Sequence, residues 1–173
     1  MSTDTTLASS PSFQQARTWS AVLWWFFVIN FGFTALWLIA AAALPVWQVP
    51  ASFLMDDMLI KVAAEPMNER LTAAWAIVVR TTPALFLLYH AIQVFGCFRK
   101  GEVFAVKPIK HIRAAGFWTI VWAFAPSAAQ LILHGHVRLK FEPPLLAFGI
   151  ATFIAAHVMA EARRIADENA SIL

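Results

Sequence analysis

An uncharged stretch from Trp19 to Val49 most constrains how this chain can fold. Roughly 20 consecutive apolar residues suffice to cross the hydrocarbon core of a bilayer as a helix. The part from Ser20 to Leu44 is therefore predicted to span a membrane. Trp24 and Trp25 near one end of this run, and Trp47 near the other, suit the two bilayer interfaces, where indole rings gather.

Three further apolar runs follow the first. The expected spans are Ala73 to Cys97, about Ala114 to Leu133, and Leu145 to about Ala160. Composition agrees, because 60% of the residues are hydrophobic and 13% are charged, whereas about a quarter are charged in soluble domains. The predicted fold class is all-α, an integral membrane bundle of four transmembrane helices spread over residues 19–162.

We also predict the structure of the segments outside the four spans. Residues 1–18 are polar and nearly uncharged, so they are predicted to be a flexible cytoplasmic tail. Between the first two spans, Phe53 to Val62 is expected to form a short amphipathic helix on the outer surface. No helix breaker follows the fourth span, so residues 163–173 are expected to continue that helix into the cytoplasm.

A basic loop between the second and third spans sets the predicted orientation. Residues 98–113 contain one acid, Glu102, and five basic residues: Arg99, Lys100, Lys107, Lys110 and Arg113. With four spans, both termini lie on the side of this loop. That side carries eight Lys and Arg residues, and the other side carries four. Arg80, within the second span, is the last of the thirteen Lys and Arg residues in the chain. Because cytoplasmic loops are enriched in Lys and Arg, we predict an N-in, C-in protein of the bacterial inner membrane.

Two sets of polar residues are expected at membrane depth, each at a spacing that places its members on one helix face. The second span carries His90, Gln93 and Cys97, and the fourth carries His157, Glu161 and Arg164. One hypothesis makes His90 and His157 the axial ligands of a b-type haem in an electron-transfer subunit. The alternatives are interhelical hydrogen bonding, with Glu161 satisfying His157, and a proton-responsive role for the histidines.

Arg80 is the remaining charged residue within a span. Its long side chain is expected to reach outward toward Asp56, Asp57 or Glu69. The chain has no glycine-rich phosphate loop, nucleophile elbow or zinc-protease helix, and no paired carboxylates within a span. We therefore predict no enzymatic activity, no catalytic residue and no metal site, and no cofactor apart from the haem hypothesis.

The basic loop and the C-terminal tail form the predicted partner-binding surface, which comprises Arg99, Lys100, Lys107, Lys110, Arg113, Arg163 and Arg164. One role expected for such a surface is binding to the lipid phosphates of the bilayer. The acids Asp167 and Glu168 favour a protein partner, because they add nothing to binding an anionic membrane. Direct binding of nucleic acid is not expected, since the basic residues stand at the ends of apolar runs.

Several short motifs are shared with a known family. They are GEVF from Gly101 to Phe104, IKHIR from Ile109 to Arg113, Gly116 at the start of the third span, and the ending EARRIADENASI. With these motifs the chain resembles the bacterial family called domain of unknown function 2975, from the second span to the tail. The resemblance implies a small four-span inner-membrane protein, frequently encoded beside a small helix-turn-helix regulator.

The function expected from these observations is a membrane-bound regulatory or sensory subunit. Its cytoplasmic loop and tail would hold a small helix-turn-helix regulator at the membrane. One alternative is an immunity or envelope-stress protein that acts against membrane-active peptides. The other is the haem-binding electron-transfer subunit described above.

Overall fold

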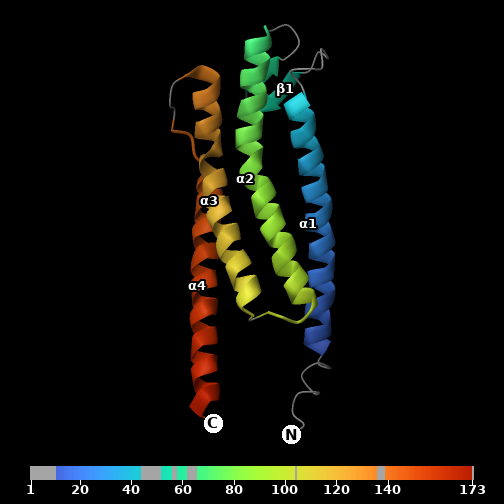
Figure 1. Cartoon of the computed structure of the whole chain (residues 1–173), viewed down its shortest axis with the longest axis vertical. Coiled ribbons are helices and arrows are strands. Elements are labelled where there is room, and N and C mark those ends of the chain that lie inside the picture. The colour runs from blue at the N-terminus through green and yellow to red at the C-terminus, as the bar shows by residue number, and fades with distance from the viewer. Residues whose placement is uncertain are drawn as a thin grey trace.

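The computed structural model of the chain describes residues 11–43, 52–55, 58–61, 66–103, 105–135 and 139–172. These residues form four long helices and one two-stranded hairpin (Figure 1). In chain order the elements are α1 (Pro11–Ala43), β1 (Ser52–Met55), β2 (Met58–Lys61), α2 (Met67–Arg99), α3 (Val106–His134) and α4 (Pro143–Ile172).

The helices run up and down and pack in chain order. Helix α1 packs on α2, α2 on α3, and α3 on α4, so α1 and α4 form the outer edges of the array. The start of α1, the end of α4 and the connection between α2 and α3 all lie at one end of the molecule (Figure 1). We call it the basic end, and the opposite end, which carries β1 and β2, the hairpin end.

All four helices are long and apolar enough to cross a membrane, which confirms the predicted number and character of the spans. The two edge helices are also the most exposed. Only 6% of the most apolar stretch of α1 and 11% of that of α4 are buried, against 33% and 39% for α2 and α3. Such extensive apolar exposure is unusual for a protein surrounded by water and is expected for helices that face lipid.

The helices extend beyond the predicted spans at the basic end. Residues 11–18, expected to be flexible, belong to α1, and the second half of the predicted basic loop belongs to α3, which starts at Val106. Hydropathy marks where a helix leaves lipid, and a helix can continue into water beyond that point. Pro108 fits the first turn of α3, where the backbone N–H groups have no partner within the helix.

Glycines bring α3 and α4 into close contact. A Cβ atom placed on Gly116 would lie 2.9 Å from the backbone nitrogen of Phe153, and one on Gly149 would lie 3.0 Å from the carbonyl oxygen of Gly116. Neither position has room for a side chain. Small residues allow this close approach of membrane helices, whose association depends on packing and hydrogen bonds.

Contacts with α3 near Pro126 hold the chain segment just before α4. Pro126 lies within α3 and has no N–H to donate to the helix. Nearby, the carbonyl oxygen of Ala123 accepts a hydrogen bond of 3.1 Å from the backbone N–H of Glu142. The hydroxyl of Ser127 also accepts a bond of 2.9 Å from the N–H of Lys140. The chain before α4 is therefore folded back along α3, which shifts α4 toward the basic end.

As a result, α4 extends past the other helices at the basic end (Figure 1). Helix α4 continues without a break to Ile172, so residues 163–172 are helical, as expected. At the opposite end, the expected amphipathic helix from Phe53 to Val62 is wrong. Strands β1 and β2 pair there as an antiparallel hairpin, in which Ser52 faces Lys61 and Met55 faces Met58. A helix this short is marginal in water without packing partners, whereas the two paired strands share backbone hydrogen bonds.

Candidate functional site

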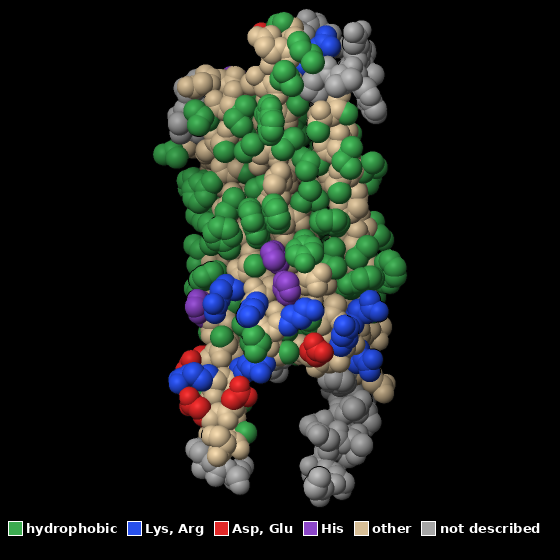
Figure 2. Space-filling view, in the orientation of Figure 1, with side chains coloured by type: hydrophobic (Ala, Val, Ile, Leu, Met, Phe, Trp, Pro, Cys, Tyr) green, Lys and Arg blue, Asp and Glu red, His purple; other side chains and the backbone are tan. Residues whose placement is uncertain are grey.

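Basic side chains form a band at the basic end. Figure 2 shows Lys and Arg gathered there below a broad apolar surface, with acidic side chains on the part of α4 beyond the band. The seven residues predicted to bind a partner lie in this region, but they line two different hollows. Arg99, Lys100 and Lys107 line one hollow, and Lys110, Arg113, Arg163 and Arg164 line the other.

The second hollow, the α3–α4 cleft, lies between the first turns of α3 and the extension of α4. Its volume is ≈ 580 Å³. Ile109 is 5% exposed and, with Val106 and Ala160, gives the cleft an apolar part. The polar lining consists of Lys110, Arg113, Arg163, Arg164, Asp167, Glu168 and Ser171.

The two walls of the α3–α4 cleft differ in charge. On α4, Arg163 Nε lies 3.4 Å from Asp167 Oδ2, and Arg164 Nη1 lies 2.9 Å from Glu168 Oε1. These pairs join neighbouring turns of one helix and partly neutralise that wall. On α3, Lys110 and Arg113 form no ion pair with any acid among the described residues. The α3 wall therefore offers positive charge to an incoming group.

Glu161 and His157 do not form the hydrogen bond that was considered for them. The Glu161 carboxylate instead accepts hydrogen bonds from Arg164, one helical turn further on. The ring of His157 packs against Phe153 at a centroid distance of 5.1 Å, on an exposed part of α4. Both residues belong to the surface of α4.

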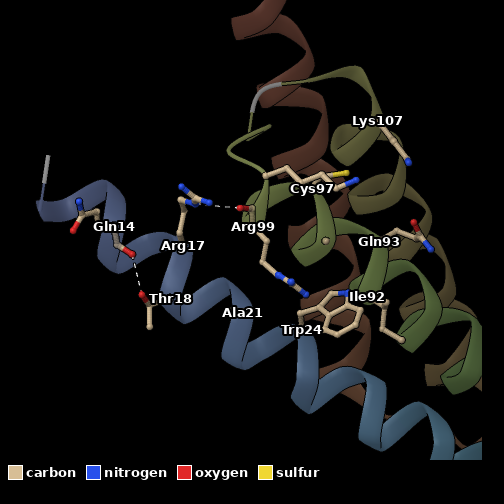
Figure 3. A pocket seen from close by; sticks show the side chains of 12 residues that line it. Gln14, Arg17, Thr18, Ala21, Trp24, Ile92, Gln93, Cys97, Arg99 and Lys107 are labelled. Atoms are coloured by element: carbon tan, nitrogen blue, oxygen red, sulfur yellow. Dashed lines mark hydrogen bonds between the residues drawn. The ribbon is translucent and has the colours of Figure 1, made fainter. Parts of the chain in front are cut away.

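The first hollow, the α1–α3 pocket, is lined by α1, α2 and the start of α3. It has a volume of ≈ 800 Å³ (Figure 3). Arg17 Nε donates a hydrogen bond of 3.2 Å to the carbonyl oxygen of Arg99, which ties α1 to the end of α2. The guanidinium carbon of Arg99 lies 4.7 Å from the centre of a Trp24 ring, a cation–π contact. Gln93 and Cys97, predicted as part of a polar stripe, line the same pocket.

Arg17 and Trp24 were not predicted as site residues. Each carried a sequence signal, because Arg17 immediately precedes the first span and Trp24 lies near its interfacial end. The sequence did not indicate that α1 packs on the end of α2. That pairing places both side chains beside Arg99.

The partner of His90 is His111 on α3. The two Nδ1 atoms lie 3.0 Å apart, and Tyr89 packs edge-on against His90 at a centroid distance of 5.2 Å. His157 lies on α4, and α3 separates that helix from α2. The structure therefore does not bring His90 and His157 together as a pair of axial ligands.

Arg80 is directed toward the chain segment before α4. Its Nη2 lies 3.8 Å from Glu142 Oε1, and the Arg80 side chain is 21% exposed. Asp56 and Asp57, two of the acids expected to pair with it, lie outside the described residues. Arg80 also borders a hollow of ≈ 430 Å³ whose polar lining includes Asn30, Thr34 and Thr81.

Neither metal chemistry nor similarity to other proteins identifies the site. Within the described ranges, no three His, Cys, Asp or Glu side chains are grouped closely enough to hold a metal ion. In comparisons with protein-family models, curated proteins and solved structures, the chain shows no significant match. The two hollows at the basic end are therefore the candidate functional sites.

Proposed function

We propose that the chain is a non-enzymatic, multi-pass protein of the bacterial inner membrane that holds a small cytoplasmic helix-turn-helix regulator at its basic end. The α3–α4 cleft is the observation that carries this proposal, because it joins the basic residues of α3 to the extension of α4 in one concave surface. The regulator as partner comes from the family resemblance described above.

The distribution of charge supports a cytoplasmic position for the basic end. Lys and Arg are concentrated there, and cytoplasmic segments of membrane proteins carry an excess of these residues. The extension of α4 is exposed and carries paired acids and bases. Asp167 and Glu168 disfavour contact with anionic lipid, so this part of α4 suits the cytosol and a protein partner.

The chemistry of the cleft indicates what kind of surface would dock. A helix with an apolar stripe would place two or three side chains against Ile109 and Ala160. Acidic residues beside that stripe would face Lys110 and Arg113 on the α3 wall. The small helices of a helix-turn-helix protein can present such a combination on a face that does not contact DNA.

A fractionation experiment tests the proposal. A tagged helix-turn-helix protein from the neighbouring gene is expected to sediment with membranes only when this chain is present. Lys110→Glu with Arg113→Glu should release it to the soluble fraction, because the α3 wall would then repel acidic side chains. Lys100→Glu with Lys107→Glu is the matched control, which changes the same charge in the other pocket and should leave the regulator bound.

Two results would reject the proposal. One is a regulator that stays soluble whether or not the chain is present. The other is equal loss of binding in the two charge-reversed variants, because that would show a general effect of positive charge at the membrane. Immunoblotting the membrane fraction for each variant controls for loss of the protein itself.

A further inference from the structure

We infer that the α1–α3 pocket binds the phosphate headgroup of an anionic phospholipid from the inner leaflet. This inference concerns different residues from those of the α3–α4 cleft, and it does not require a regulator. It rests on the polarity of the pocket along the helix axes, on its charge and on its place at the edge of the apolar surface.

Polarity changes with depth in the α1–α3 pocket. On α1, Arg17 lies toward the basic end, and Ala21 and Trp24 follow one and two turns deeper on the same face. Lys100 directly follows α2 at the basic end, and Ile92 lies on α2 about two turns deeper. The pocket therefore has a cationic rim and a partly apolar floor. A phospholipid has the same order, with phosphate followed by glycerol and acyl chains.

The charge of the pocket is entirely positive. Four of the twelve residues that line it are basic, namely Arg17, Arg99, Lys100 and Lys107, and none of the twelve is acidic. The α3–α4 cleft differs, since Asp167 and Glu168 contribute to its lining. An anion is consequently favoured in the α1–α3 pocket far more than in the cleft.

The two arginines are positioned by contacts that leave hydrogen-bond donors for a ligand. The guanidinium carbon of Arg99 lies over a Trp24 ring, 4.7 Å from its centre, and this cation–π contact uses none of the N–H groups as hydrogen-bond donors. The bond from Arg17 to the Arg99 carbonyl uses Nε and leaves the two Nη groups. Figure 3 shows these side chains where α1 meets the end of α2. Guanidinium groups with such donors suit phosphate oxygens.

The size and place of the pocket favour a lipid over a free anion. A volume of ≈ 800 Å³ lies within the usual range for small-molecule sites and holds a headgroup with its glycerol. Trp24 in the floor suits the boundary between headgroups and acyl chains. Inorganic phosphate would use the cationic rim alone. Basic pockets between membrane helices on the cytoplasmic side commonly bind lipid headgroups.

Lipid retention by the purified protein tests the inference. The detergent-solubilised chain is titrated with phosphatidylglycerol or phosphatidylcholine, and bound lipid is counted by native mass spectrometry. We expect one tightly retained phosphatidylglycerol and no retained phosphatidylcholine. Lys100→Gln with Lys107→Gln should weaken that binding about 30-fold, because each cation near an anionic surface contributes about fivefold.

The matched control is Lys110→Gln with Arg113→Gln, which removes the same charge from the same band outside the pocket. It should retain phosphatidylglycerol as the unaltered protein does. Equal loss in both variants, or equal binding of phosphatidylcholine, would overturn the inference. A large excess of inorganic phosphate is added in a separate arm. Continued retention of the lipid supports a headgroup site, and displacement of the lipid by phosphate would assign the pocket to a soluble anion instead.

Discussion

Nδ1 of His90 on α2 lies 3.0 Å from Nδ1 of His111 on α3, so the two imidazole rings share one hydrogen bond. One nitrogen must carry the proton and the other must accept it through its lone pair. The bond therefore requires at least one neutral ring. If both rings were protonated, two N–H groups of like-charged rings would face each other across the α2–α3 interface.

The first prediction is that acid weakens the packing of α2 on α3. Below about pH 6.5, the ordinary titration range of histidine, the folded protein must lose the shared bond or exclude the second proton. The unfolded chain then binds more protons than the folded one, so the stability falls as the pH falls. We expect a loss of about 1 kcal/mol, the contribution of one hydrogen bond, in thermal unfolding between pH 8 and pH 5.

A glutamine at position 111 should remove this pH dependence. An amide can donate to a neutral His90 and can accept from a protonated one, so His111→Gln keeps a bond in both states. His157→Gln is the control, because His157 is exposed on α4 and packs on Phe153. If His111→Gln leaves the pH profile unchanged, the shared bond does not cause it.

The second prediction concerns the contact between α3 and α4. Gly116→Ala should destabilise the protein by about 1–3 kcal/mol, the usual cost of overpacking, because the new Cβ would lie 2.9 Å from the backbone of Phe153. Gly32→Ala is a matched control on α1, where nothing lies within 4 Å of the new atom. Thermal unfolding in detergent should show a lower midpoint for Gly116→Ala alone. Equal midpoints for the two variants would mean that the helices separate at little cost.

The third prediction concerns the chain segment folded back along α3. Ser127→Ala removes two hydrogen bonds to Lys140, one to its N–H and one to its carbonyl oxygen. The segment should then detach more readily, at a cost of about 1 kcal/mol for each bond. Hydrogen exchange at the amides of residues 140–142 should become faster. Ser171→Ala, which removes one bond within the last turns of α4, should leave those amides unaffected.

The apolar runs of the sequence were sufficient to predict the four helices and their alternating direction. They did not predict the ends of the helices, because a charged residue such as Lys107 marks the boundary of lipid while the helix continues through it. They also did not predict where α4 begins. That depends on the carbonyl group of Ala123, which accepts a hydrogen bond from the N–H of Glu142, nineteen positions later, and no periodic pattern records such a contact.

The site was predicted in its composition but not in its arrangement. Helical spacing placed His90 and Gln93 on one face of the second span, yet it gave no indication of which helix that face meets. His111 lies in the segment that the sequence predicts as a loop, and no pattern in the sequence pairs it with His90. The seven basic residues were predicted as one surface, and the packing of α1 and α4 on opposite sides of the array divides them between two hollows.

Both proposals require that the four helices cross a membrane with the basic end in the cytosol, and labelling of single cysteines tests this topology directly. Cys97 is 4% exposed and is first replaced by Ala. New cysteines are then placed at Asn68→Cys near the hairpin end and at Glu168→Cys on the extension of α4. A membrane-impermeant maleimide should label intact spheroplasts at position 68 and should reach position 168 only after permeabilisation. Labelling of position 168 in intact spheroplasts would contradict the account.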